Sequence, residues 1–210
     1  MVRSDNFKEV AKQLIDVGSF FNEQHWAPAT TGSLSSRLDK WHIAITVADC
    51  CKGEMDDDDI TVVDLKSGKA GNGFPVSDES KLHARLYHQD DRIGAVLHSH
   101  SRNGTVLSKI YREQLITLTD YEALKVFPDI DIRDGRAVVP VFSNHKDFSE
   151  LAEQVENYLL EHPAMYGCLI EGHGFYTWGM DVEDARRHIE AFEFLFACEM
   201  DLLKLGVCSV

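Results

Sequence analysis

Short apolar runs alternate with amphipathic segments along the whole chain, and this alternation is what most constrains its fold. In the amphipathic segments, apolar residues recur every three to four positions, which is typical of one face of an α-helix. The apolar runs are short and bounded by turn-forming residues, which is typical of buried strands. We therefore expect helices over 7–25, 78–88, 104–111, 121–127, 147–159 and from 181 onward, and strands over 31–37, 41–46, 60–65, 93–97, 115–119, 137–142, 166–170 and 175–178.

This order of elements predicts the α/β class, with a mixed or largely antiparallel central sheet and helices on its faces. The sequence has no internal repeat, no low-complexity segment and no linker long enough to divide it. We therefore expect residues 1–210 to form a single domain.

The charge balance excludes some classes of partner. The chain has 210 residues, with 21 Lys and Arg against 35 Asp and Glu, which gives a formal net charge of −14. A chain this acidic is repelled by phosphate backbones and anionic membranes, so we expect neither nucleic acid nor membrane as a partner. A small anionic substrate stays possible, because a local basic pocket can outweigh the mean field.

Location follows from what the sequence lacks. No run of about 18 apolar residues is present, so we expect no transmembrane helix. The first 16 residues contain no apolar core of a secretory signal. The five cysteines form no CxxC pair and are expected to be free thiols in a reducing cytoplasm: Cys50, Cys51, Cys168, Cys198 and Cys208.

The strongest local signal for chemistry is His98-Ser99-His100, at the end of the apolar run 93–97. Residues i and i+2 of a strand point to the same face, so the two imidazoles project together. This spacing suits two ligands of one tetrahedral zinc ion. The alternative is a pair of polar residues at a strand end.

A second signal is His173, which lies between Gly172 and Gly174 in a turn between two predicted strands. Alone it is as consistent with an ordinary turn residue as with a ligand. Together with His98 and His100 it makes a three-histidine set with an open fourth position, which is typical of a catalytic rather than a structural zinc site.

Small polar residues at 30–35 suit a backbone nest for a phosphate or another oxyanion, although the segment alone is more typical of a polar loop that enters a strand. Lys52 is a candidate to add charge to such a nest, or else a solvated loop residue. Ser77 is a candidate phosphate donor or a helix cap, and a helix N-terminus there favours either role.

Acidic residues are harder to assign. The run 56–59 lacks the ligand pattern of an EF-hand loop, so we expect a solvated loop or strand connection. Glu122 has apolar neighbours, so it is either a partly buried carboxylate with a raised pKa or a surface helix residue. The physical chemistry of the sequence does not decide between these alternatives.

Taken in order, the 30–35 loop, the segment 77–80, the HSH motif and the late GHG motif resemble the class II aldolase superfamily over nearly the whole chain. More specific stretches are similar to the dehydratases of methionine salvage within it: 26–30, 95–101, 120–122, 172–179 and 190–196. The resemblance implies a three-layer α/β sandwich, one zinc ion per subunit, a sugar-phosphate substrate and a homotetramer with sites near subunit boundaries.

The resemblance also implies roles for individual residues. His98, His100 and His173 match the zinc ligands, and Glu122 matches the catalytic acid/base of the dehydratases. Glu79 falls where related aldolases have an acidic residue beside the metal, and we expect it near the substrate or the resting metal. The residues that surround the substrate phosphate are Gly32, Ser33, Lys52 and Ser77.

The chain departs from the family pattern mainly around this phosphate pocket. Ser33 stands where an amide side chain is usual, and Asp49 adds an acid in a loop that usually reads Ser-Gly-Lys. Glu171 adds further negative charge beside His173. Two other functions therefore stay open: a class II sugar-phosphate aldolase or epimerase on the same scaffold, and a non-catalytic binding protein.

Overall fold

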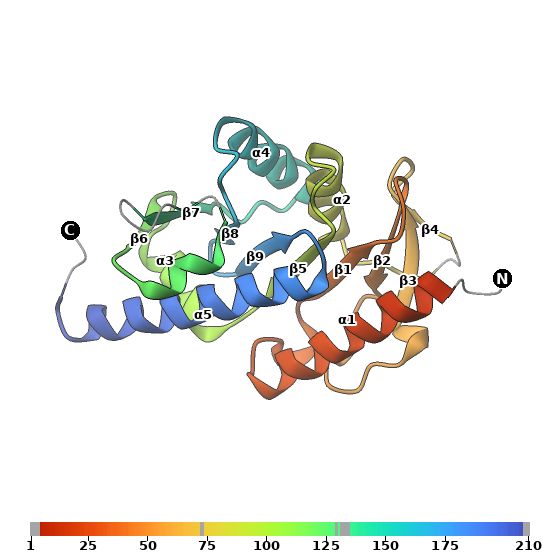
Figure 1. Cartoon of the computed structure of the whole chain (residues 1–210), viewed down its shortest axis with the longest axis horizontal. Helices are drawn as coiled ribbons and strands as arrows, with labels where there is room; N and C mark the ends of the chain where they lie inside the picture. The colour runs from red at the N-terminus through yellow and green to blue at the C-terminus, as the bar shows by residue number, and fades with distance from the viewer. Residues whose placement is uncertain (1–4, 72–73, 129, 131–134, 208–210) are drawn as a thin grey trace.

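A nine-stranded sheet forms the centre of the computed structural model, which describes residues 5–71, 74–128, 130 and 135–207 (Figure 1). The strands lie in the order β4-β3-β2-β1-β5-β9-β8-β7-β6. Neighbours are antiparallel except β7 and β8, which are parallel. Their bounds are β1 Ser33–Arg37, β2 His42–Thr46, β3 Ile60–Asp64, β4 Lys69–Ala70, β5 Ala95–Ser99, β6 Leu115–Thr119, β7 Arg136–Phe142, β8 Gly167–Ile170 and β9 Gly174–Gly179.

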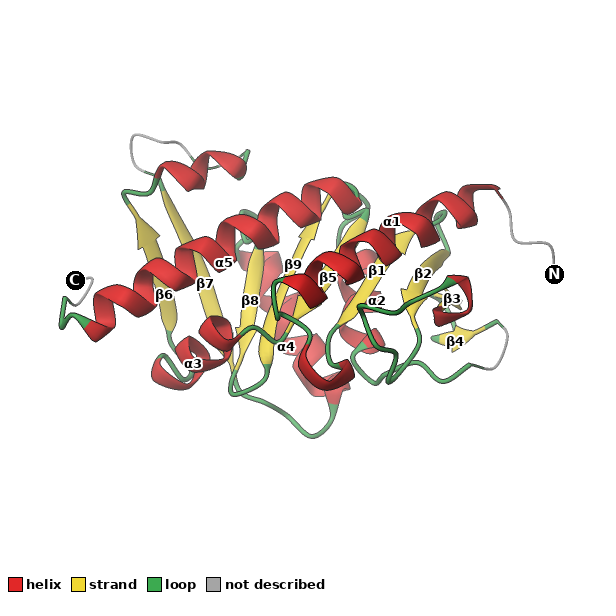
Figure 2. Cartoon of the chain, turned by 90° about the horizontal axis from the view of Figure 1, so that it is seen from below, coloured by secondary structure: helices red, strands yellow, loops and turns green. Residues whose placement is uncertain are grey.

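Helices cover both faces of the sheet and give three layers (Figure 2). One face carries α1 (Asp5–Glu23), α3 (Arg102–Ile110) and α5 (Val182–Lys204), and the other carries α2 (Ser80–Gln89) and α4 (Phe148–Glu161). Three short 3-10 helices lie in the connections: η1 Pro28–Thr30, η2 Asp57–Asp59 and η3 Glu122–Val126. The predicted fold class is confirmed.

Each face has its own apolar core, and the alternation of side chains along β5 determines which residues enter each. Ala95 and Leu97 join the core under α1 and α5, whereas Val96 joins the core under α2 and α4. Because side chains alternate along a strand, His98 lies on the α2 face and Ser99 on the α5 face. The central strand therefore presents an imidazole toward α2.

The predicted elements correspond to the observed ones to within about two residues at each end, and three differences matter here. The helix expected over 121–127 is the 3-10 helix η3. The helix expected over 78–88 begins at Ser80, and the N-cap is Glu79 rather than Ser77. The hydroxyl of Ser77 accepts a hydrogen bond from the Glu79 backbone N–H at 3.3 Å, so it supports the turn before the helix. Strand β4 was not predicted, because two residues carry no periodicity.

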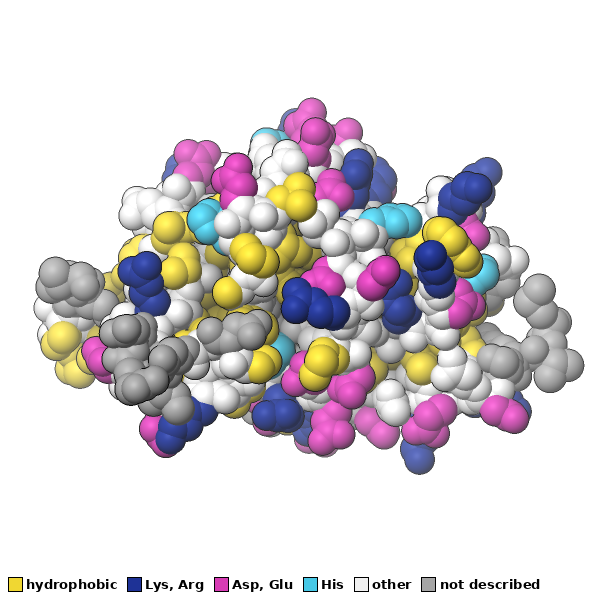
Figure 3. Space-filling model, turned by 45° about the horizontal axis from the view of Figure 1, so that its top comes forward, with side chains coloured by type: hydrophobic (Ala, Val, Ile, Leu, Met, Phe, Trp, Pro, Cys, Tyr) yellow, Lys and Arg dark blue, Asp and Glu magenta, His cyan; other side chains and the backbone are white. Residues whose placement is uncertain are grey.

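Charged side chains of both signs lie on the surface. Acidic and basic side chains are interspersed over the face shown in Figure 3 rather than gathered by sign. No helix in the described part of the chain has the length and apolar character needed to cross a membrane. The run 56–59 closes a capping box on η2 before β3 begins, which confirms the expectation of a strand connection.

Candidate metal centre

Three histidines and one glutamate converge at the edge of the α2 layer. One candidate ligand atom from each of Glu79, His98, His100 and His173 lies within 4.8 Å of the other three. The Nε2 atoms of His98 and His100 are 2.8 Å apart, and Nε2 of His173 is 3.2 Å from Oε1 of Glu79. That oxygen is also 3.5 Å from Nε2 of His98 and 3.8 Å from Nε2 of His100.

Three separate parts of the fold bring these side chains together. His98 is in β5, His100 follows the strand, His173 is in the turn between β8 and β9, and Glu79 is the N-cap of α2. The backbone N–H of His100 donates to the Trp26 carbonyl at 2.7 Å, which fixes the chain beyond β5. The predicted projection of both imidazoles to one face is therefore observed.

Two glycines allow the backbone to approach β5 closely. A Cβ atom on Gly174 would lie 2.1 Å from the Ser99 carbonyl oxygen and 2.9 Å from Cε1 of His98. A Cβ atom on Gly32, which has a φ of +81°, would lie 2.7 Å from the His98 carbonyl oxygen. Larger residues at either position would push the turn or the loop away from the histidines.

The protonation of His98 suits a cation at the centre. Its Nδ1 lies 3.1 Å from the carbonyl oxygen of Phe175, so this nitrogen carries the hydrogen and Nε2 presents a lone pair inward. Burial lowers the pKa of His98 to about 4, against the opposing attraction of Glu79, which favours the neutral imidazole.

The other donors complete a set that fits a divalent metal. Burial alone would raise the pKa of Glu79, but the interactions of its carboxylate with His98, His100 and His173 outweigh burial and hold the pKa below its usual range. Nδ1 of His173 is buried and, within the described residues, has no hydrogen-bond partner. Three imidazoles beside one carboxylate match the ligand preference of zinc, and the cluster could bind a metal ion.

Most residues predicted for a phosphate pocket lie beside this centre. The Ser33 hydroxyl donates to Oε2 of Glu79 at 2.8 Å, Gly32 lies against the His98 backbone, and Ser77 lies in the turn before Glu79. Lys52 is one step removed. Its Nζ donates to the carbonyl oxygens of Cys50 at 3.0 Å and Thr30 at 3.4 Å.

Lys52 is only 2% exposed, so the alternative of a solvated loop residue is wrong. Its ammonium group instead ties the loop before β1 to the loop after β2. This burial had no signal in the sequence beyond the type of residue.

Glu122 lies apart from the histidines. Its side chain is 80% exposed on η3, so the alternative of a partly buried carboxylate is wrong. It forms an ion pair with Lys125, and no hydrogen bond or ion pair among the described residues connects it to the cluster. The structure thus unites the predicted metal ligands with Glu79 but does not unite Glu122 with them.

Sequence reasoning missed two aromatic neighbours of the centre. The ring of Tyr176 stacks on His98 with centroids 3.8 Å apart, and His83 meets Tyr176 edge to face at 5.8 Å. A signal for His83 was present, since Glu79, His83 and Tyr87 follow one another at helical spacing.

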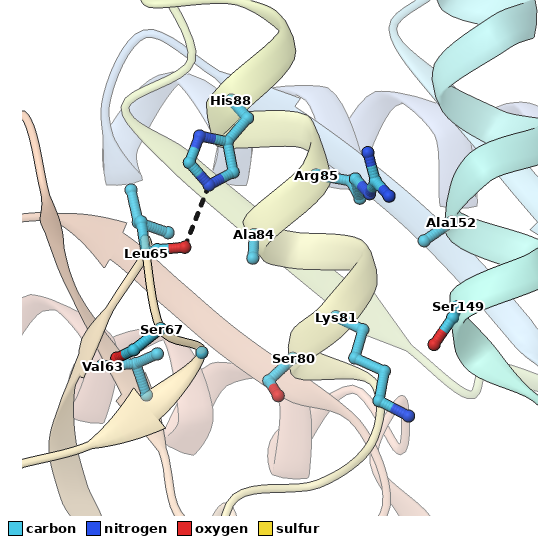
Figure 4. A pocket seen from close by; sticks show the side chains of 11 residues that line it. Val63, Leu65, Ser67, Ser80, Lys81, Ala84, Arg85, His88, Ser149 and Ala152 are labelled. Atoms are coloured by element: carbon cyan, nitrogen blue, oxygen red, sulfur yellow. Dashed lines mark hydrogen bonds between the residues drawn. The ribbon is translucent and has the colours of Figure 1, made fainter.

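A hollow of about 560 Å³ lies between α2, α4 and the end of β3, away from the histidine cluster (Figure 4). Lys81 and Arg85 line it, but Lys81 is paired with Asp78 at 3.2 Å and Arg85 with Glu156 at 3.0 Å. The charges of these two cations are therefore compensated, and none of the four clustered residues lines this hollow.

The fold and this centre define a protein of the class II aldolase type. The model of the class II aldolase and adducin N-terminal domain matches residues 12–200, and the chain belongs to this family. It is 43% identical to a methylthioribulose-1-phosphate dehydratase from Pseudomonas aeruginosa (strain UCBPP-PA14) over 203 residues, which is 97% of this chain and 99% of that protein.

Two further likenesses agree. The chain is 44% identical to a methylthioribulose-1-phosphate dehydratase from Xylella fastidiosa (strain M12), over 96% of this chain and 93% of that protein. The solved L-fuculose-1-phosphate aldolase from Thermus thermophilus superposes with a TM-score of 0.74 at 24% identity, over 96% of this chain and 97% of that one. The second likeness supports the fold alone.

Proposed function

We propose that the chain is a metal-dependent lyase that removes water from 5-methylthioribulose 1-phosphate and yields 2,3-diketo-5-methylthiopentyl 1-phosphate, a step of methionine salvage. The observation that carries the proposal is the convergence of three imidazoles and Glu79 within 4.8 Å in one chain. Identity of 43% to a named dehydratase over nearly both full lengths identifies the reaction.

We propose zinc as the metal, one ion per subunit, held by His98, His100 and His173. The hydrogen bond from Nδ1 of His98 to a backbone carbonyl supports this assignment, because such a bond orients a ligating imidazole. A zinc ion held by these three residues would supply a Lewis acid, which would polarise the substrate carbonyl and make the neighbouring C–H more acidic.

Glu122 is our candidate for the acid/base. A carboxylate that takes the proton from this carbon and returns a proton to the departing hydroxyl accounts for loss of one water. Its exposure and its separation from the histidines support a site completed between copies of the chain, with Glu122 serving the centre of a neighbouring subunit. We accordingly propose a homotetramer.

The substrate phosphate is proposed to bind near Gly32, Ser33, Lys52 and Ser77. Support comes from the position of Gly32, Ser33 and Ser77 beside the histidine centre. Glu79 is proposed to face the substrate beside the metal. Asp49 is exposed in the adjoining loop.

Two expectations about the whole chain become proposals here. We infer a cytoplasmic protein, supported by the acidic composition and by four free cysteines among the described residues. Cys208 lies outside the described residues. We also propose that residues 1–210 form one domain, since both apolar cores span the sheet.

A product assay tests the proposal. Zinc-loaded protein is incubated with 5-methylthioribulose 1-phosphate and followed by mass spectrometry and NMR. Loss of one water with formation of a diketone supports the dehydratase. Two smaller fragments would indicate retro-aldol cleavage, and unchanged substrate with metal bound would contradict a catalytic role on this substrate.

A further inference from the structure

A buried line of hydrogen bonds leads away from Glu79 under the α2 layer. The Ser33 hydroxyl lies 2.8 Å from Oε2 of Glu79 and 3.0 Å from Nε2 of His83. Nδ1 of His83 lies 2.7 Å from the Ser35 hydroxyl, which lies 2.9 Å from the hydroxyl of Tyr87. We call these five residues the Glu79–Tyr87 chain.

The periods of two facing elements produce this line. Glu79, His83 and Tyr87 follow at intervals of four residues, which places them along one side of α2. Ser33 and Ser35 are two apart on β1, so they share the face of the sheet below α2. Ser33, Ser35, His83 and Tyr87 are each at most 3% exposed, so water does not compete for their hydrogen bonds.

The chemistry of the groups fixes the direction of every bond. An ionised carboxylate only accepts hydrogen bonds, so Ser33 donates its single hydroxyl hydrogen to Glu79. The Ser33 oxygen must then accept a hydrogen bond from His83. Nε2 of His83 therefore carries a hydrogen. Burial lowers the pKa of His83 to about 3, so the ring is neutral and its Nδ1 accepts from Ser35. Ser35 then accepts from Tyr87.

We propose that His83 is a positioning residue, which, through Ser33, holds the Glu79 carboxylate with one oxygen toward the three histidines and the other turned away. Oε1 of Glu79 faces Nε2 of all three imidazoles, whereas Oε2 is bound to Ser33. Without this hold the carboxylate is free to turn both oxygens toward a cation and occupy the position that the substrate needs.

The inference assigns Ser33 a role other than phosphate donor, since its hydroxyl hydrogen is committed to Glu79. It concerns the site of the proposed function and depends on that function only for the turnover measurement. The tautomer of His83 and the affinity of the site for zinc are measurable without any substrate.

The direct test is the tautomer of His83 in the full chain, read by NMR of ¹⁵N-labelled imidazole with assignment from His83→Gln. We expect hydrogen on Nε2 and none on Nδ1 from pH 6 to pH 8. Hydrogen on Nδ1, or a doubly protonated ring, would overturn the proposal, because the bonds would then run in the opposite direction or end at His83.

The second test compares variants in zinc content, kcat and KM. His83→Leu removes both ring nitrogens, whereas His83→Gln keeps an amide N–H at the Nε2 position. Since a hydrogen bond between neutral groups contributes about 0.5–1.5 kcal/mol, we expect kcat to fall roughly two- to tenfold in His83→Leu at full zinc content. His83→Gln should retain most of kcat. Equal kcat in the two variants would contradict positioning.

Ser33→Ala provides a small substitution in case His83→Leu fails to fold. It should lower kcat at least as much as His83→Leu does, and the double variant Ser33→Ala/His83→Leu should be no worse than Ser33→Ala alone, because both act through the bond from Ser33 to Glu79. Losses of kcat that add up in the double variant would contradict the proposal that both residues act through the same bond.

A matched control is His188→Leu. His188 is also a buried helical histidine, but it bonds to the Trp178 carbonyl at 2.7 Å and is not part of the Glu79–Tyr87 chain. It should lower stability and leave kcat unchanged. An equal fall of kcat in His188→Leu and His83→Leu would show a general packing effect and overturn the proposal. If wild-type protein shows no turnover, the tautomer and the zinc affinity of His83→Leu against His83→Gln decide the inference by themselves.

Discussion

The histidine centre and the η3 segment are two regions with opposite character. His98 is fully buried, is paired through the sheet with Tyr176 and hydrogen bonds to a backbone carbonyl. Glu122 is 80% exposed and is bound only to Lys125 among the described residues. The first region is packed and hydrogen-bonded within one chain, whereas in the second the Glu122 carboxylate faces solvent.

The contrast fits the roles that we propose for the two groups. A metal ligand must keep its lone pair in one direction, which a central strand, a glycine-flanked turn and a packed helix provide. A group that moves protons must reach the substrate after it binds, and an exposed segment can bring it there from a neighbouring copy. The predictions below test this division, from the largest expected effect to the smallest.

Removing a metal ligand should cause the largest loss. His98→Ala is expected to lose stoichiometric zinc and to lower turnover by roughly a thousandfold or more, since a metal contributes several kcal/mol to the transition state. Zinc content by elemental analysis and turnover on the same sample check this. Full zinc occupancy in the variant would contradict the role of His98 as a ligand.

Glu122→Gln should separate the two regions. The amide keeps the size of the side chain and removes its proton transfer, so we expect full zinc content with turnover lowered roughly a hundredfold or more. Near-normal turnover would remove Glu122 from the mechanism.

Hybrid oligomers sharpen the same prediction. If Glu122 serves the centre of a neighbouring copy, co-expression of His98→Ala with Glu122→Gln should recover activity that neither variant has alone. In such a hybrid an intact centre meets an intact Glu122 from its neighbour. No recovery in a purified hybrid would place both groups in one subunit's site.

Glu193 lies behind the histidines and bonds to Ser99, and its burial makes the stability of the folded protein depend on pH. Ser99 donates to its Oε1 at 2.9 Å, and Oε2 is buried without a hydrogen-bond partner among the described residues. Burial raises the pKa of Glu193 to about 7 from its ordinary value of 4.5. The folded protein therefore holds this proton where the unfolded chain has lost it.

The direction of this pH dependence follows from the difference between the pKa of Glu193 in the folded and in the unfolded state. Protonated Glu193 favours the folded state fully below pH 4.5, and this contribution disappears as pH rises to about 7, by at most about 3 kcal/mol. Denaturant unfolding at a series of pH values measures it. Glu193→Gln should remove that slope and be the more stable protein at pH 8, and an unchanged slope would show that another group titrates.

The same comparison shows which structural features could be predicted from the sequence. The convergence of His98, His100 and His173 could be predicted, because the two-residue period of a strand and a turn between glycines are local rules. Most helices and strands followed from periodicity for the same reason. The start of α2 at Ser80 was missed, because Ser77 and Glu79 are both acceptable near a helix N-terminus and only packing chooses between them.

What could not be predicted depends on contacts between distant segments. The burial of Lys52 requires two loops about 20 residues apart to close over it, and no local pattern encodes that. The role of Ser33 depends on α2 lying over β1. Glu122 was undecided from its neighbours, because Tyr121 and Leu124 pack inward while the carboxylate itself points to solvent.

The smallest expected effect is at the exposed end of the comparison. Lys125→Ala breaks the ion pair with Glu122, but the two side chains are 47% and 80% exposed. Water screens such a pair and its side chains lose entropy on pairing, so we expect the free energy of unfolding to change by less than about 1 kcal/mol. Denaturant unfolding checks this. A larger loss would mean that η3 is a structural element in its own right, and the view of Glu122 as a group held only loosely by its own subunit would have to be abandoned.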